Sequence, residues 1–254
     1  MIHAVILGAG NVATHLYRAL KEAKGVAIVQ WYNRDSSKLQ SYQNEVQIID
    51  KINDLTVADI YIIAVTDDAI EEISTKLSFT NRFVVHTSGA MSLHTLDKKN
   101  RRGVFYPLQT FTKDQAIDFS EVPICVETER KEDRPLINSL AEALNCKYYR
   151  VNTDQRSALH LAAVYVNNFT NQLYRVGHEI TESQSVDFNI LKPLIKETAK
   201  KIETISPYMA QTGPAKRNDK KTIKKHLRML EKDIHKDIYE LMTKSIKITH
   251  GKKL

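Results

Sequence analysis

The first residues that could do chemistry form a glycine turn near the beginning of the sequence. Gly8, Gly10 and Ala13 give the spacing G-x-G-x-x-A between the apolar run IHAVIL and a helical pattern. The first glycine permits a sharp turn, the second leaves room for a pyrophosphate, and the small third residue lets helix and strand pack closely. A dinucleotide site is therefore favoured over a plain tight turn, and free amides at the helix start would help to bind its phosphates. The predicted cofactor-binding residues of this turn are Gly8, Gly10, Asn11, Val12 and Ala13.

The end of the second apolar run, VAIVQWY, indicates which dinucleotide would bind. An NAD site usually presents an acidic residue to the ribose hydroxyls at this point, whereas an NADP site offers an arginine to the 2′-phosphate. Here the run is followed by Asn33 and Arg34, which predicts NADP as the cofactor. The alternative is that Arg34 is a solvated loop cation and that Asp35 binds the ribose.

Later apolar runs also end in small or polar residues. AVTDDAI supplies Thr66, and HTSGAMS supplies Ser88. Ligands of open α/β sheets bind at the carboxyl ends of the strands, so we expect Thr66 beside the dinucleotide and Ser88 beside a substrate. Ordinary strand ends have the same composition, which leaves a purely structural role open.

A histidine and several asparagines lie on one long helical segment. At about 100° per residue, His160, Asn167 and Asn171 form one stripe, and Asn168 lies close to it. Buried polar groups need partners, so this stripe could face a substrate cleft. We predict His160 and Asn168 as catalytic residues, with His160 moving a proton and the asparagines orienting the substrate. The alternative is a core or dimer helix in which these side chains bond to the backbone.

A second candidate segment, TGPAKRND, connects two predicted helices. Thr212 lies in its turn, and Arg217 could hold a carboxylate or a phosphate with two hydrogen bonds. These two residues are predicted to bind substrate, as are Ser88, Asn167 and Asn171. The alternative is a plain connecting turn in which Asp219 caps the next helix.

The elements that must position these residues fall into two parts. Up to about residue 152, β-rich runs alternate with amphipathic segments, which predicts an α/β fold with a doubly wound, mostly parallel Rossmann sheet. From residue 153 to 254 no strand pattern occurs, and Asn152 with Gln155 has the spacing of a helix capping box. We therefore expect a dinucleotide-binding domain over 1–152 and an all-helical substrate and dimerisation domain over 153–254.

Composition excludes several other classes of protein. The 254 residues carry a net charge of +7 and include two cysteines, which gives no disulfide framework and no metal quartet; we expect no metal site. No apolar run reaches the roughly 20 residues of a membrane span, so the protein is expected to be cytoplasmic. The basic charge is concentrated in residues 191–254, but no aromatic stacking pattern accompanies it, so nucleic acid is not an expected partner.

The sequence also resembles known families. The pattern GAGNVATHL…NRDSSKL…ADIYIIAVTDDAI is similar to the Rossmann domains of the pyrroline-5-carboxylate reductase and 6-phosphogluconate dehydrogenase-like superfamily. HTSGAMS, YPLQTF, ALHLAAVYVNNFTNQLY and TGPAKRND resemble a narrower group, which pairs a Rossmann-like domain with a helical domain of unknown function. The resemblance implies NADP binding at the residues predicted above and at Ala64, Val65 and Thr66. It also implies a homodimer with interlocking long helices.

One departure limits the chemistry. The hydroxyacid dehydrogenases of the superfamily carry a catalytic lysine in the long interdomain helix, and the long helix here has none. We therefore expect an NADP-dependent oxidoreductase that transfers a hydride between nicotinamide and a small imine, ketone or acid-derived substrate. The alternative is a non-catalytic NADP-binding regulatory protein.

Overall fold

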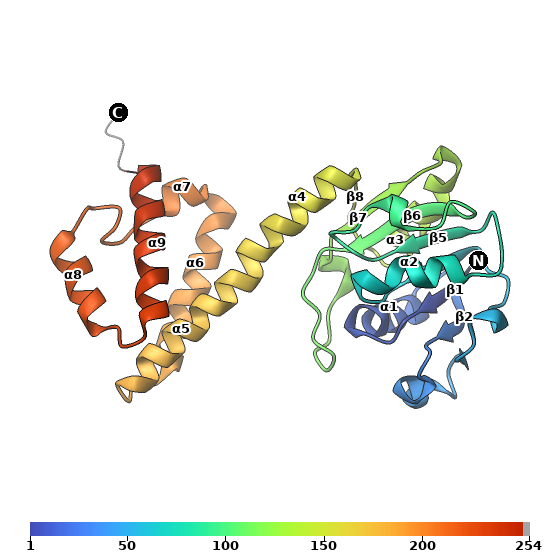
Figure 1. Ribbon diagram of the computed structural model, residues 1–254, viewed down its shortest axis with the longest axis horizontal. Helices are drawn as coiled ribbons and strands as arrows, with labels where there is room; N and C mark the ends of the chain where they lie inside the picture. The colour runs from blue at the N-terminus through green and yellow to red at the C-terminus, as the bar shows by residue number, and fades with distance from the viewer. Residues whose placement is uncertain (251–254) are drawn as a thin grey trace. The chain divides into compact units, whose positions relative to one another are not determined.

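The computed structural model describes residues 1–250 and forms two compact units, Met1–Asn167 and Asn168–Leu254. Figure 1 follows the chain through both units by colour. The predicted fold class is confirmed: a mostly parallel sheet is followed by helices only. The position of the functional boundary, expected at residue 152, stays a prediction.

The first unit contains one eight-stranded sheet of order β3-β2-β1-β4-β5-β6-β7-β8. All neighbouring strands are parallel except β6 and β7, which are antiparallel. The strands are β1 Ile2–Leu7, β2 Val26–Tyr32, β3 Gln47–Ile49, β4 Ile60–Ile63, β5 Phe83–His86, β6 Arg101–Pro107, β7 Ile124–Thr128 and β8 Tyr148–Arg150. The order reverses between β1 and β4, and a ligand crevice is expected at such a switch point.

The helices of this unit follow from local sequence. The α-helices are α1 Asn11–Glu22, α2 Asp67–Lys76, α3 Arg134–Ala143 and α4 Thr153–Ala163. Short 3-10 turns lie at Ser36–Tyr42, Ile52–Asp54, Leu93–Thr95, Phe119–Glu121 and Lys131–Asp133. The predicted capping box is confirmed, because Asn152 accepts from the Gln155 amide and Gln155 accepts from the Asn152 amide. This box fixes the beginning of α4.

The core of the first unit lies on both faces of the sheet. All four residues of β4 are buried, as expected for a parallel strand covered on both sides. Leu16 and Leu20 of α1 pack on one face, and Ile70 of α2 packs on the other. Both cysteines, Cys125 and Cys146, are free and buried.

The second unit is helical. It contains α5 Thr170–Ser183, a 3-10 turn at Phe188–Leu191, α6 Lys192–Thr204, α7 Pro207–Ala210, α8 Lys220–Met229 and α9 Asp233–His250. Asp219 caps α8 by accepting from the Thr222 amide, as its position in the sequence suggested. Among the described residues of this unit, only Ala215 and His235 are buried.

Two local features differ from the sequence prediction. The short strand β3 was not predicted, because its three residues carry too little pattern to be distinguished from a loop. The long helical segment contains a π-helical stretch, Val164–Phe169, between α4 and α5. A π-helical turn contains more residues than the 3.6 of an α-helix. His160, Asn167 and Asn171 therefore do not form the regular stripe that was predicted at 100° per residue, and that prediction is wrong.

Residues 1–250 contain neither a membrane-spanning helix nor a metal-binding cluster of side chains. None of the described helices combines the length and apolarity of a membrane span. Within the same residues, no cluster of three or more histidines, cysteines or carboxylates is placed to hold a metal ion.

Candidate functional site

A cavity of about 710 Å³ lies where the sheet order reverses, at the carboxyl ends of β1, β2, β4 and β5. Nine of the ten predicted cofactor residues line it; the exception is Ala13. Those nine are Gly8, Gly10, Asn11, Val12, Asn33, Arg34, Ala64, Val65 and Thr66. The predicted residues Ser88 and His160 line it as well. All of these residues belong to the first unit.

The glycine turn forms one wall of this cavity. Gly8 has φ +119°, and a Cβ atom there would lie 2.2 Å from the carbonyl oxygen of Ala64, so only glycine fits. The Trp31 indole donates to the Gly8 carbonyl over 2.6 Å and holds the turn. Ala13 is fully buried against the strand side of α1, which explains why the third position of the motif is small.

The next glycine leaves the backbone open. A Cβ atom on Gly10 would meet nothing within 4 Å, and Gly10 begins α1 without a capping side chain. The first amides of a helix have no partner inside it and carry the positive end of the helix dipole. A diphosphate therefore has both the space and the hydrogen-bond donors that it needs at this turn.

The end of β2 contributes positive charge. Arg34 and Lys38 line the cavity, and neither side chain has a hydrogen-bond or ion-pair partner among residues 1–250. Asp35, the alternative ribose ligand, is not a lining residue; its carboxylate accepts from the Ser37 hydroxyl, which lowers the pKa of Asp35. This arrangement fits a phosphorylated ribose better than a bare one.

The other end of the cavity is formed by the residues that follow β5. The hydroxyl of Ser88 accepts from the amides of Ala90 and Met91, at 3.1 and 3.0 Å. The Ser88 amide donates to Nδ1 of His86 over 3.1 Å. Burial lowers the pKa of His86 to about 4, so this ring is neutral and acts as a structural acceptor.

His160 of α4 reaches this end of the cavity and has a partner that the sequence did not reveal. Its Nδ1 atom lies 3.2 Å from the hydroxyl oxygen of Tyr106, the residue before the last in β6. Burial raises the pKa of Tyr106 to about 12. Tyr106 could have been suspected from its place at a strand end, but its pairing with a residue 54 positions later is tertiary.

A buried ion pair fixes the helix that carries His160. Arg156 has a fully buried side chain, and its guanidinium bonds to the carboxylate of Glu127 on β7 and to the Met91 carbonyl. The Thr153 amide and hydroxyl also donate to Glu127, at 3.0 and 3.1 Å. The first turn of α4 is thus anchored to the sheet, which holds His160 at a defined place.

Besides Ala13, five predicted site residues do not line the cavity. Asn167 is exposed in the π-helical stretch at the end of the first unit. The others belong to the second unit, where they are exposed: Asn168, Asn171, Thr212 and Arg217. Their proposed roles at a substrate stay predictions.

Side chains on α1 hold the loop that follows β6. Asn11 donates to the Phe111 carbonyl over 2.9 Å, and Arg18 donates to the Lys113 carbonyl over 3.2 Å. Between them, the His15 ring lies 2.9 Å from the Thr112 carbonyl. The segment after YPLQTF is therefore fixed to the same helix whose beginning forms the glycine turn.

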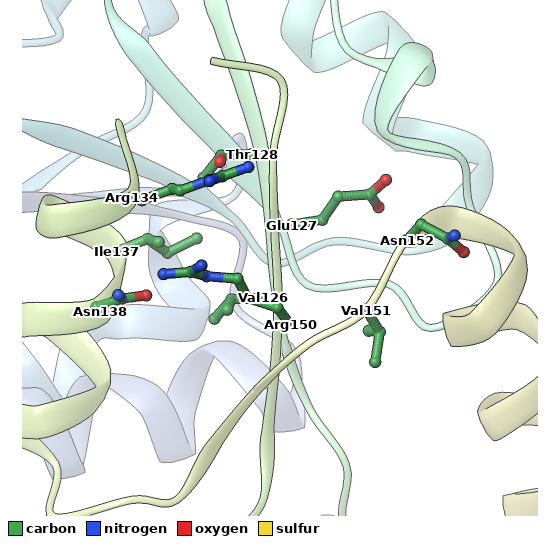
Figure 2. Close-up of a pocket in the computed structure, with 9 residues that line it drawn as sticks. All are labelled: Val126, Glu127, Thr128, Arg134, Ile137, Asn138, Arg150, Val151 and Asn152. Atoms are coloured by element: carbon green, nitrogen blue, oxygen red, sulfur yellow. The ribbon is translucent and has the colours of Figure 1, made fainter. Parts of the chain in front are cut away.

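A second, smaller cavity of about 260 Å³ lies between β7, β8 and α3 and shares no residue with the first. Figure 2 shows the side chains of Arg134, Arg150 and Asn138 on one side of β7, whereas Glu127 points to the other. None of the predicted site residues lines this cavity.

Comparison with solved structures gives similarity over the whole chain. A suggested NADP oxidoreductase of Bacteroides fragilis is 35% identical, with a TM-score of 0.87 and coverage of 99% of this chain and 98% of that one. A protein of Thermotoga maritima is 20% identical, with a TM-score of 0.74 and 98% coverage of both chains.

An enzyme with a known activity has the same fold. The imine reductase of Myxococcus stipitatus in complex with NADP⁺ is 15% identical, with a TM-score of 0.68 and coverage of 98% of this chain and 96% of that one. No curated protein matches the chain. Residues 122–246 match the family described as "Domain of unknown function (DUF2520)". With this match, and with 35% identity to the Bacteroides protein over nearly all of both chains, the chain belongs to the DUF2520 family.

Proposed function

We propose that this protein is an NADP-dependent oxidoreductase that transfers a hydride between nicotinamide and a small imine, ketone or acid-derived substrate. The observation that carries the proposal is that one cavity is lined by two kinds of residue. The glycine turn and the unpaired side chains of Arg34 and Lys38 line it, and so do Ser88 and His160. A cofactor that spans such a cavity would meet phosphate-binding groups and proton-handling groups at once. The NADP⁺ complex of the similar imine reductase supports the choice of cofactor.

In this proposal the residues divide by task. The open backbone at Gly10 and the beginning of α1 bind the diphosphate, while Arg34 and Lys38 bind the ribose phosphate. NADPH supplies the hydride when it is bound. Ser88 and His160 orient the substrate, and His160 handles the proton, with Asn168 as a further proposed catalytic residue.

The helical part completes the proposal. Residues 1–152 would bind the dinucleotide, and residues 153–254 would contribute Asn167, Asn171, Thr212 and Arg217 to the substrate site. The buried free cysteines fit a reducing compartment such as the cytoplasm. No role for nucleic acid or a membrane is part of the proposal.

A homodimer through the helical residues is also proposed. Large apolar side chains are exposed along the helices of the second unit, and such surfaces usually mark an interface. The most exposed of them are Ile190, Leu194, Met209, Met229, Ile234, Leu241 and Ile248, each above 60%. The resemblance to dimeric families with interlocking helices favours a second copy of this chain as the partner.

A non-catalytic NADP-binding regulator is the second candidate. The observation in its favour is the absence of lysine from the long helical segment 153–183. The hydroxyacid dehydrogenases that the chain resembles need a lysine there. In this case NADPH would bind but would not be oxidised in the presence of any small imine or ketone.

Cofactor preference tests the main proposal. We expect NADPH to bind more tightly than NADH by isothermal titration calorimetry. Replacing Arg34 with glutamine should weaken NADPH binding by about 10- to 100-fold, the value of one charge-assisted contact, and should leave NADH binding within about twofold.

Lys24→Gln provides the matched control, because Lys24 is exposed and does not line the cavity. It should change neither affinity. Equal loss of NADPH and NADH binding in Arg34→Gln would contradict the assignment of Arg34 to the 2′-phosphate.

A further inference from the structure

The pair formed by Tyr106 and His160 lies directly against Gly89, a lining residue of the nucleotide cavity. A Cβ atom on Gly89 would come within 2.6 Å of the Tyr106 ring, 2.7 Å of His160 Nδ1 and 2.9 Å of the Tyr106 hydroxyl. The backbone of Gly89 therefore packs on both side chains where they meet. Any larger residue would separate them, so the glycine is required for the contact.

The hydrogen bond of this pair has a direction. Burial raises the pKa of Tyr106 to about 12, so the phenol keeps its proton at neutral pH. The Tyr106 hydroxyl has no other hydrogen-bond partner among residues 1–250, which leaves Nδ1 of His160 as the acceptor of that proton. In a neutral imidazole only one nitrogen carries hydrogen, and an accepting Nδ1 puts it on Nε2.

We propose that Tyr106 is a positioning residue that fixes His160 as an Nε2–H donor toward the cavity, and that the donor serves the oxygen of a carbonyl substrate. This inference rests on the proposed oxidoreductase function and narrows its substrate class to small ketones and aldehydes. The ring orientation is fixed twice, by the Tyr106 hydroxyl and by the anchored first turn of α4.

The proton balance explains the choice of a carbonyl. When a hydride reaches the carbonyl carbon, the π pair of the C=O bond moves to the oxygen, and the oxygen takes the Nε2 proton of His160. Nδ1 takes the hydroxyl proton of Tyr106, and the tyrosinate recovers a proton from water. A carbonyl needs this donor, because its oxygen becomes an anion during reduction.

An iminium substrate has no such need. Its nitrogen already carries the proton and the positive charge, and it becomes a neutral amine when the hydride is added. An N–H donor aimed at that nitrogen would find no lone pair in the ground state. The buried guanidinium of Arg156 on the same helix would also disfavour a second cation, although Glu127 offsets much of that charge.

The tautomer of His160 can be measured directly by NMR of ¹⁵N-histidine-labelled full-length protein. Spectra would be recorded at alkaline pH. The His160 signals are those lost in His160→Gln. We expect the Nε2–H pattern in the unmodified protein and averaged shifts of both tautomers in Tyr106→Phe and in Gly89→Ala.

Tyr148→Phe is the matched control, because the Tyr148 hydroxyl bonds only to Glu142 on the protein surface. It should leave the His160 signals unchanged. An Nδ1–H pattern in the unmodified protein, or unchanged His160 shifts in Tyr106→Phe, would overturn the positioning role. This result does not depend on NADPH, so it separates the inference from a failure of the proposed function.

The substrate class is tested by NADPH oxidation with cyclopentanone and other small cyclic ketones against 2-methyl-1-pyrroline at a pH at which its nitrogen is protonated. With a ketone we expect Tyr106→Phe to lower kcat at least tenfold and to leave KM almost unchanged. If the imine is turned over, its kcat should change less than twofold. Turnover of the imine alone, or of no probe while NADPH binds, would overturn the carbonyl assignment. Absence of NADPH binding would instead remove the proposed function.

Discussion

The two compact units differ in how they bury apolar surface. In the first unit, the central strands and α1 contain side chains such as Ile62, Leu16 and Phe105 that have no exposed surface. In the second unit, only Ala215 and His235 are buried among the described residues, and many large apolar residues are exposed. The first unit therefore carries its own core, whereas the second exposes apolar side chains that the proposed dimer would cover.

Polar contacts show a related difference. The first unit uses buried polar groups to fix its site, as in the Arg156–Glu127 pair behind His160. The second unit uses a largely exposed cluster in which Glu179 accepts from Lys232 and Arg175. Exposed pairs of this kind contribute little to stability. The difference suggests that the sheet unit supplies a rigid site and that the helical unit depends on association.

Removing a buried side chain from the core of the first unit should have the largest effect on the free energy of unfolding. Ile62 lies on a central strand and is fully buried, so Ile62→Ala should cost about 2–5 kcal/mol. Val57, which is 68% exposed in the same unit, is the control, and Val57→Ala should cost less than about 0.5 kcal/mol. Urea unfolding followed by Trp31 fluorescence measures both. Similar losses would contradict a self-contained core in this unit.

The first unit should also respond to mild acid. The folded pKa of His86 lies near 4 because of burial, whereas the unfolded value is about 6.5. The unfolded chain therefore takes up the proton first as the pH falls. The stability contribution of a neutral His86 is complete above about pH 6.5 and declines toward pH 4, by roughly 3 kcal/mol in total.

Unfolding of the first unit across this pH window, again followed by Trp31, measures the decline. His86→Asn keeps a hydrogen-bonding side chain that does not titrate, so it should flatten the pH dependence. Three carboxylates of the second unit, Glu179, Asp187 and Asp219, have lowered pKa values; at Glu179 the hydrogen bond from Lys232 is the largest cause. Their contribution is present above the unfolded value and is lost only when the pH falls below about 4.

A charge placed on the exposed apolar surface of the second unit should weaken the proposed dimer. Leu194 is 62% exposed on α6, and a lysine there would have to lose its hydration in an apolar contact. We expect Leu194→Lys to raise the dimer dissociation constant at least tenfold by sedimentation velocity. Lys200→Gln on the same helix should leave it unchanged, and a protein that is monomeric before mutation would refute the proposed dimer.

The smallest expected effect concerns a helix cap in the second unit. Asp219 accepts from the Thr222 amide at 3.0 Å and from its hydroxyl at 2.7 Å, so Asp219→Ala should destabilise the beginning of α8 by about 1 kcal/mol. Hydrogen exchange of the α8 amides should become about fivefold faster. Asp237→Ala, on α9, removes a carboxylate without a cap and should not change this rate.

The sequence predicted the features that depend on local spacing. The turn at Gly8 and Gly10, the Arg34 cation after β2 and the capping box at Asn152 are each defined by residues only a few positions apart. Long-range pairs could not be predicted in this way. Tyr106 meets His160 across 54 residues, and Arg156 meets Glu127 across 29, so only the folded sheet brings them together.

The predicted stripe of His160 and the asparagines shows a second limit of prediction from sequence. Its prediction assumed a regular period of 3.6 residues, and the π-helical stretch at Val164–Phe169 changes that period within the segment. Nothing in the composition of VYVNNF marks such a stretch. His160 reaches the cavity because it precedes this stretch, on the part of α4 that Asn152 and Arg156 fix to the sheet.

The most direct test of the account uses the one tryptophan of the chain. Trp31 is buried and donates to the Gly8 carbonyl, so it lies next to the proposed diphosphate site. Titration with NADPH should quench Trp31 emission and produce nicotinamide emission by energy transfer, with saturation at one NADPH per chain and weaker binding of NADH. Folded protein that shows no saturable transfer with either coenzyme would contradict the claim that this cavity binds NADP.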